Sequence, residues 1–208
     1  MVSADGRGLW RDEGGAVMLE VTATIGLMLL VTFATVETGH LYYQWNVATK
    51  ATQLGARLAA VSNPVTAQLL TLTGLEGGAL PGDPMPAFDI TCSGATASCT
   101  GGGYSTTAMN TLVFGRGDNQ CNAALVTSDR ALGMCDVFDR IRPQNVVIRY
   151  QYTGLGYAGR PGGAVPTVTV SLTGLTFDFV ALNTLLGLGP ITIPGLHTTI
   201  TGEDLRGS

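Results

Sequence analysis

The feature that most constrains this chain is an apolar stretch near its N-terminus, Ala16 to Val36, AVMLEVTATIGLMLLVTFATV. It contains one charged residue, Glu20, and about 20 apolar residues at a rise of 1.5 Å each are enough to cross the hydrocarbon core of a membrane. No proline occurs before Pro64, and helix-compatible sequence continues to Ser62. The pattern therefore predicts one long helix over 16–62 that spans a membrane at 16–36.

The composition agrees with a membrane-associated or assembly protein. Charged residues make up 12% of the 208 residues, whereas about 25% is usual in soluble domains. The formal net charge is −4 and no cluster of Lys or Arg occurs, so the sequence offers no electrostatic surface for nucleic acid. The length leaves room for one ordinary domain in addition to the helix.

Two patterns occupy the half of the predicted helix that follows the span. Larger residues at spacings of three and four predict the face that covers a folded domain: Tyr43, Val47, Ala51, Leu54, Leu58 and Val61. Beside them, Ala51, Gly55 and Ala59 form a stripe of small residues at spacing four, which lets another backbone approach closely. Packing between subunits and ordinary packing within the chain are both open interpretations of this stripe.

All four cysteines lie after the apolar stretch, at Cys92, Cys99, Cys121 and Cys135. No Cys-x-x-Cys pair occurs and the chain has 2 histidines, so disulfides in an oxidising compartment fit better than a zinc site. Of the three connectivities, we predict that neighbours pair, Cys92 with Cys99 and Cys121 with Cys135. Four reduced thiols in a cytosolic protein are the alternative. Because the charges flanking the span do not orient it, the cysteines are the reason to place the C-terminal region outside the cytoplasm.

The region after Asn63 becomes rich in Gly, Pro and Thr, which ends the helix. Alternation of apolar and polar residues predicts strands, and capping residues with a three-and-four spacing predict helices. The predicted elements are a strand at Ala87–Cys92, a loop at Ser93–Ser105, a helix at Asp129–Ile141 capped by Ser128, strands at Asn145–Thr153 and Pro166–Phe179, a short helix at Leu182–Leu188 and an extended piece at Ile191–Ile193. The fold class is therefore α+β, with a small antiparallel sheet packed on the long helix.

Two segments resemble known families. The segment RDEGGAVMLE, Arg11 to Glu20, is similar to a type IV prepilin processing site, in which a dedicated peptidase cuts after a glycine and a glutamate is fifth in the mature chain. The segment VETGHLYYQWNVATKATQLGARLAAV, Val36 to Val61, resembles the TadE family of pseudopilins in tight-adherence (Tad/Flp) pilus systems, in which Glu-x-Gly, a tyrosine-rich turn and Gly-Ala-Arg-x-Ala-Ala recur in this order. The residues that carry this second match are Glu37, Gly39, Tyr42, Tyr43, Gly55, Ala56, Arg57, Ala59 and Ala60.

The resemblance implies a minor pilin that takes part in the assembly or priming of a type IV-like pilus for surface adherence, without enzymatic activity or a cofactor. Cleavage is expected between Gly15 and Ala16, which makes 1–15 a cytoplasmic leader, 16–62 the long helix and 63–208 a periplasmic or extracellular domain. The implied partners are other pilin subunits, the prepilin peptidase, the pilus assembly platform of the inner membrane and the membrane itself. The implied location is the inner membrane, in a single pass, and then the pilus or cell surface.

Glu20 is the residue to which we assign the central role in assembly. A carboxylate inside an apolar span costs a few kcal/mol unless it is paired. Cleavage would expose an amino group at Ala16, in the same subunit or a neighbour, and pairing with this amine in a low-dielectric bundle would set the register between helices. We also assign Glu37 and the stripe of Ala51, Gly55 and Ala59 to assembly.

Three alternatives to a pilin are open. The first is a secretory signal peptide with cleavage near Ala34, after the small-residue pattern Thr32-Phe33-Ala34, and the second is an uncleaved membrane anchor. The third is a membrane-anchored external enzyme or ligand-binding module. That reading would need a reactive constellation around a residue such as His197, but the sequence contains neither Gly-x-Ser-x-Gly nor His-Glu-x-x-His.

Overall fold

A computed structural model describes residues 13–117, 119–121, 131–177, 179–202 and 205. The chain forms two compact units, of which unit 1 comprises residues 1–42 and 178–190 and unit 2 comprises residues 43–177 and 191–208. Helix α1, Glu13–Val61, contributes to both units and confirms the long helix predicted at 16–62. The helix ends just before Asn63, as expected because the residue that precedes a proline avoids the α conformation.

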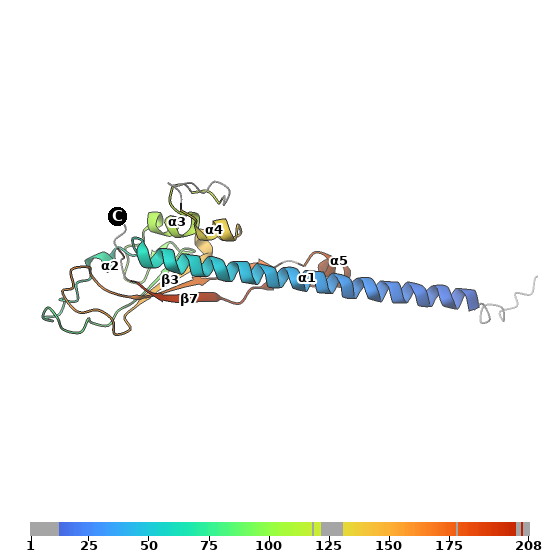
Figure 1. The fold of residues 1–208 in the computed structure, drawn as a ribbon, viewed down its shortest axis with the longest axis horizontal. Helices are drawn as coiled ribbons and strands as arrows, with labels where there is room; N and C mark the ends of the chain where they lie inside the picture. Colours follow the sequence, from blue (N-terminus) through green and yellow to red (C-terminus); the bar gives the residue numbers. More distant parts are fainter. Residues whose placement is uncertain (1–12, 118, 122–130, 178, 203–204, 206–208) are drawn as a thin grey trace, which may run out of the picture. The chain divides into compact units, whose positions relative to one another are not determined.

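Unit 2 is built on a five-stranded sheet in which every pair of neighbours is antiparallel (Figure 1). The strands are β1 (Asp89–Ser93), β2 (Ser98–Cys99), β3 (Val146–Gln151), β4 (Thr167–Leu172) and β7 (Leu196–Thr201), in the order β2-β1-β3-β4-β7. The α+β class is therefore confirmed. The predicted strands at 87–92 and 145–153 appear as β1 and β3, each with slightly different ends.

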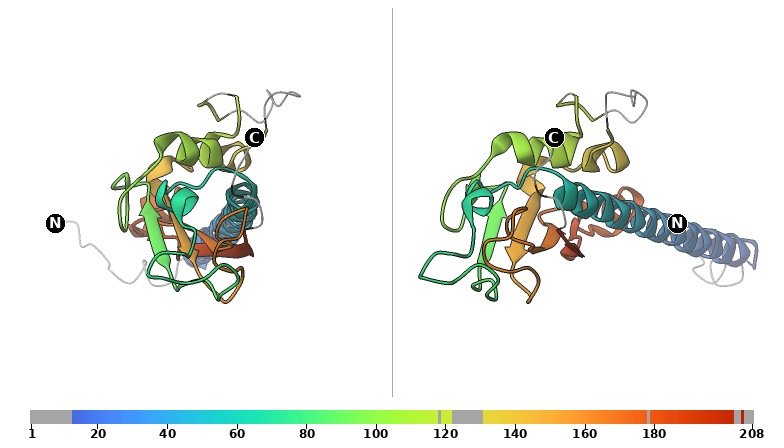
Figure 2. Two further views of the ribbon diagram at one scale, coloured as in Figure 1. Left: turned by 90° about the vertical axis from the view of Figure 1, so that its left-hand side faces the viewer. Right: turned by 60° about the vertical axis from the view of Figure 1, so that its left-hand side comes forward.

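One face of this sheet forms the core of unit 2, because alternate residues of β3 and β4 are buried. Figure 2 shows the C-terminal part of α1 beside the sheet, and the alanines of this part of the helix are almost fully buried. The buried hydroxyl of Tyr150 on β3 accepts a hydrogen bond from the backbone N–H of Val65 at 3.0 Å. This bond ties the centre of the sheet to the chain just after α1.

The described residues of unit 2 also form four short helices: α2 (Gln68–Thr71), α3 (Thr106–Phe114), α4 (Met134–Val137) and the 3-10 helix η2 (Pro143–Asn145). Helix α3 was not predicted from the sequence. Ser105 caps it, since its hydroxyl accepts a hydrogen bond from the N–H of Ala108 at 3.2 Å. The helix buries Met109, Leu112 and Val113.

The helix predicted at Asp129–Ile141 is only partly right for the residues that the structure describes, while Ser128 and Asp129 lie outside them. Only the single turn of α4 is helical there. Gly133 is extended, with φ −99° and ψ 176°, and a new helix starts after it because the Asp136 carboxylate accepts a hydrogen bond from the Gly133 N–H at 2.8 Å. A Cβ at Gly133 would lie 2.2 Å from the backbone N of Gly115, so this position requires glycine.

The strand predicted at Pro166–Phe179 is divided in two. β4 ends at Leu172, and Gly174 has a φ of +69°, a conformation that interrupts the extended chain. β5 (Thr176–Phe177) then pairs with β6 (Ile191–Thr192) in a separate two-stranded sheet. The segment between these two strands, residues 178–190, carries α5 (Ala181–Leu186), close to the predicted short helix, and belongs to unit 1. Strand β7 was not predicted.

The two disulfides pair neighbouring cysteines, as predicted. Cys92 and Cys99 face each other on β1 and β2 and close a hairpin. Cys121 and Cys135 are 14 residues apart and connect residue 121 to α4. Each crosslink restricts the unfolded chain and is expected to stabilise unit 2 by about 2–4 kcal/mol.

Candidate membrane-embedded assembly site

The N-terminal half of α1 carries a continuous apolar surface. Its large side chains are exposed, for example Leu19 at 74% and Met28 at 72%. In the part of the chain that the structure describes, α1 is the one helix long and apolar enough to cross a membrane, judged by length and composition; its most apolar window has a mean hydropathy of 2.0 and none of that window is buried. Exposed apolar surface of this extent requires an apolar environment, which indicates membrane anchoring.

The hydroxyl groups of the threonines in this half are all hydrogen-bonded within the helix. Each donates its hydroxyl to the backbone carbonyl four residues earlier, at 2.5–2.8 Å. The donors are Thr22, Thr24, Thr32, Thr35 and Thr38. Such internal bonds are the usual way in which hydroxyl groups are accommodated in lipid. The carboxylate of Glu20 therefore differs from the other polar groups of the span.

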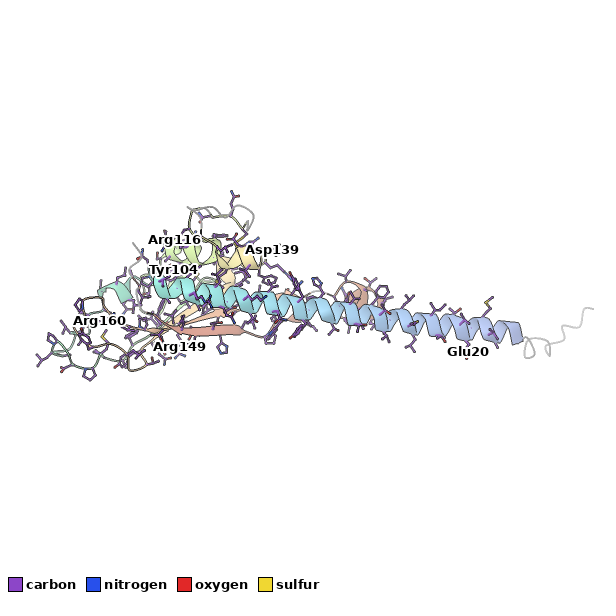
Figure 3. All side chains as sticks on the ribbon, viewed as in Figure 1. Glu20, Tyr104, Arg116, Asp139, Arg149 and Arg160 are labelled. Atoms are coloured by element: carbon purple, nitrogen blue, oxygen red, sulfur yellow. A yellow bond between two sulfur atoms is a disulfide. The ribbon has the colours of Figure 1, made fainter. Side chains whose placement is uncertain are left out.

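Glu20 lies near the N-terminal end of α1 and is exposed (Figure 3). Among the described residues, its carboxylate has no hydrogen-bond or ion-pair partner. Glu20 follows Ala16 by four residues, which in a helix is about one turn, or roughly 6 Å along the axis. The predicted processing residues Gly15 and Ala16 are also exposed on α1, and residues 1–12 of the predicted leader lie outside the described residues. The geometry thus places a charged group next to the predicted new N-terminus, with no charge to balance it in the described chain.

Glu37 has a structural partner that no sequence pattern indicates. Its side chain is 9% exposed, and its carboxylate accepts hydrogen bonds from three successive backbone N–H groups, Val180 at 2.8 Å, Ala181 at 2.5 Å and Leu182 at 3.3 Å. These N–H groups form the N-terminus of α5, where no intrahelical acceptor exists and where Val180 supplies no side-chain cap. Glu37 therefore caps α5 across a sequence distance of more than 140 residues, and the negative charge also favours the positive end of that helix.

The small-residue stripe is buried within its own chain. Ala51, Gly55 and Ala59 are all buried, and a Cβ added at Gly55 would lie 2.4 Å from the sulfur of Met134 on α4. Packing within the chain, one of the two interpretations left open, is what the structure contains, and the assignment of these three residues to contacts between subunits is corrected. The face predicted to cover the domain is also only partly right, because Tyr43 and Val61 are exposed.

Two observations concern the residues that an external enzyme would use. In the described ranges, no three residues among His, Cys, Asp and Glu are grouped as metal ligands. His197 is exposed on β7, opposite Ser171 on β4. This pairing is the ordinary cross-strand arrangement of a sheet.

Comparison with protein families gives a match between residues 15–57 and the family described as TadE-like protein. The match covers about a fifth of the chain, lies entirely on α1 and includes Glu20, Glu37 and Gly55. It confirms the resemblance found in the sequence. No similar protein was found among curated proteins or among solved structures.

Proposed function

Because α1 carries a TadE-like segment, we propose that this protein is a minor pilin subunit that takes part in the assembly or priming of a Tad/Flp type IV-like pilus used for surface adherence. The observation that carries the proposal is the position of that segment on an exposed apolar helix whose one charged residue between Ala16 and Val36 is Glu20. A helix of this kind functions by associating with lipid and with other helices. The protein thus acts by self-assembly rather than by catalysis.

The proposed mechanism starts with processing at the membrane. Prepilin peptidase cuts between Gly15 and Ala16 and leaves a new amino group about one helical turn from Glu20. In the low dielectric of a helix bundle, an amine and a carboxylate attract each other strongly, and each is costly to leave unpaired. A subunit whose Glu20 meets the Ala16 amine of a neighbour is therefore held at one axial position.

The location of each part of the chain in the cell envelope determines the remaining partners. The span at 16–36 lies in the inner membrane, and the disulfides of unit 2 support a location of residues 63–208 in the periplasm, where disulfides persist. From there the subunit enters the assembly platform together with other pilin subunits. The pilus or the cell surface is its final location.

The N-terminus of the mature protein tests this proposal. The protein is isolated from cells with prepilin peptidase, and its N-terminal sequence and intact mass are determined. We expect a chain that begins at Ala16 and has lost 15 residues. Cells that lack the peptidase are the control and should yield the chain with its leader intact.

The other outcomes separate the alternatives. A start shortly after Ala34 in cells with the peptidase would identify a secretory signal peptide. An uncut leader in those same cells would identify a plain membrane anchor. Either result contradicts the proposed function.

A further inference from the structure

The segment between β5 and β6 has an unusual composition for a connection in a domain that lies in water. Its one charged residue is Asp178, at its start, and the sequence that follows from Phe179 to Pro190, FVALNTLLGLGP, contains none. Although residues 178–190 connect two strands of unit 2, they form one compact unit with residues 1–42. The segment therefore belongs with the apolar half of α1.

Hydrogen bonds fix the level of this segment along α1. Glu37 is the first residue after the predicted span, which ends at Val36, and its carboxylate binds the N-terminus of α5. A carboxylate that accepts three N–H bonds is held much more firmly than a solvated side chain. The start of α5 is therefore held at the edge of the span.

The exposure of α1 indicates that α5 continues alongside the span. Within residues 15–43, the positions that are not exposed are Leu30, Ala34, Glu37 and Leu41, whose spacings of four, three and four place them on one helical face. Figure 1 draws α5 next to the N-terminal half of α1, and Leu182 of α5 is itself buried. Since Leu30 and Ala34 lie inside the span, a segment that shields them lies at the depth of the span.

The outer side of the segment is apolar as well. Val180, Leu185, Leu186 and Leu188 are exposed, although leucines on a short helix in an aqueous domain are normally directed inward. We propose that residues 180–188 are embedded in the outer boundary of the same membrane that α1 crosses, with lipid as the partner of these side chains. The membrane part of the protein then consists of one spanning helix and one short interfacial helix, which Glu37 holds together.

This inference rests on the membrane insertion of α1 and is tested by measuring depth in lipid. The full mature chain is placed in phosphatidylethanolamine and phosphatidylglycerol vesicles at fewer than one chain per vesicle. Leu186→Cys introduces the one free thiol, because the cysteines at the described positions are paired in disulfides. The thiol is labelled with an environment-sensitive fluorophore, and quenching by lipids that are spin-labelled near the glycerol backbone is recorded.

Two leucine positions provide matched controls for Leu186, which is 54% exposed. Leu27→Cys lies in the span and Leu80→Cys lies in unit 2, where the side chains are 65% and 69% exposed, respectively. Interfacial helices bury their apolar face about 5–10 Å into the boundary between headgroups and acyl chains, close to the shallow spin label, so we expect this label to lower the fluorescence at position 186 roughly twofold or more. The label at position 80 should stay unquenched, and the label at position 27 should be quenched best by deep spin labels.

The inference fails if position 186 behaves like position 80 while position 27 is quenched. It fails equally if position 186 is unquenched in dilute vesicles and becomes protected only at high protein density, since a second copy of the chain would then cover the segment. If position 27 is not quenched either, α1 is not inserted, and the proposed function falls together with this inference.

Discussion

The two halves of α1 belong to one uninterrupted helix but have opposite surfaces. In the N-terminal half, large apolar side chains such as Leu19 and Met28 are exposed. In the C-terminal half, the fully buried apolar positions are small, and Ala48, Ala51 and Ala56 have no exposed surface in unit 2. Small side chains let neighbouring elements approach the helix backbone, whereas large ones keep them at a distance and offer their own surface for burial.

The two halves of α1 therefore obtain their stabilising contacts from different sources. The C-terminal half obtains them inside the chain, from the sheet and from Met134 on α4. Among the described residues, the N-terminal half shares a compact unit with the segment after β5, and its exposed remainder requires lipid or other helices. Substitutions in the first half should therefore change association with other molecules, and substitutions in the second half should change the stability of the fold.

The largest expected effect concerns Glu20. Glu20→Ala and Glu20→Gln would leave the Ala16 amine without its counter-charge, and an unpaired charge in a membrane helix costs about 2.5–3.5 kcal/mol. Since 1.4 kcal/mol corresponds to a factor of ten, we expect the amount of assembled pilus to fall by more than about tenfold. The measurement is the quantity of pilus sheared from cells, at equal levels of the mature subunit in the membrane.

Thr24→Ala is the control for Glu20, one turn further along the span. It removes a hydroxyl that bonds only to the carbonyl of Glu20, so assembly should be close to normal. Full assembly with both Glu20 variants would show that charge pairing by Glu20 is not needed for the association of the N-terminal half of α1. The apolar surface would then be the whole basis of association.

The second effect compares substitutions of two glycines, one in each half of α1. Gly55→Leu should destabilise unit 2 by about 1–3 kcal/mol, because the new side chain must displace the buried Met134. Gly39→Leu meets no atom within 4 Å of its Cβ and should stabilise the helix slightly, as leucine favours helix more than glycine does. The free energy of unfolding of the full chain in detergent, followed by near-ultraviolet circular dichroism, distinguishes them. Equal changes in the free energy of unfolding for the two variants would contradict the difference between the two halves of α1.

A third effect, similar in size or smaller, concerns the hydrogen bond between Tyr150 and Val65, just after the end of α1. Tyr150→Phe removes the hydroxyl that accepts the hydrogen bond of the buried Val65 N–H and should cost about 1–3 kcal/mol in the free energy of unfolding. Tyr152→Phe, two residues further along the chain and less buried, is the matched control and should cost less. A loss of equal size in both variants would show that the bond to Val65 contributes nothing specific.

The same tyrosine predicts a pH dependence. Burial raises the pKa of Tyr150 to about 12, above its ordinary value of 10.0. Between pH 10 and 12 the unfolded chain therefore loses this proton while the folded chain keeps it. The stability that protonated Tyr150 contributes is complete below pH 10 and is lost as the pH rises toward 12. Unfolding measured across this range should show a steeper loss for the natural chain than for Tyr150→Phe.

Much of the fold could be predicted from the sequence where one local signal dominates. The unbroken apolar run predicted α1, and strict alternation predicted β3. Helix α3 was missed because its apolar residues follow a run of glycines that indicates a loop. Strand β7 was missed because it is an edge strand in which Leu196 is the one buried residue, so alternation is weak.

The site could be predicted only where it depends on local composition. Glu20 stands out as a charge in an apolar stretch, and no tertiary information is needed to recognise it. The partner of Glu37 is more than 140 residues away, and no spacing rule connects the two. The stripe that contains Gly55 satisfies the same pattern whether its neighbour is another subunit or Met134, so only the three-dimensional structure decides between them.

The smallest expected effect belongs to the face of unit 2 that is directed toward water. Arg149 on β3 donates its Nε–H to Asp89 on β1 at 2.8 Å, and a second contact joins Nη2 of the arginine to the other carboxylate oxygen. Both side chains are nearly half exposed. Exposed ion pairs are weakened by solvent and salt, so this pair should contribute far less than the buried contacts of α1.

The stabilisation from the ion pair of Asp89 and Arg149 should depend on pH. The hydrogen bond from Arg149 lowers the pKa of Asp89 below its ordinary value of 3.8. The stabilisation is therefore fully present above that ordinary value and is lost as the pH falls through the lowered pKa of the folded state. A double-mutant cycle of Asp89→Asn and Arg149→Gln, measured as melting temperatures of the full chain in detergent, should show a small coupling at pH 7 that is lost as Asp89 becomes protonated in acid and is weakened by high salt. A coupling as large as the effect of Tyr150→Phe would contradict the assignment of this face to water, because only a desolvated pair reaches that strength.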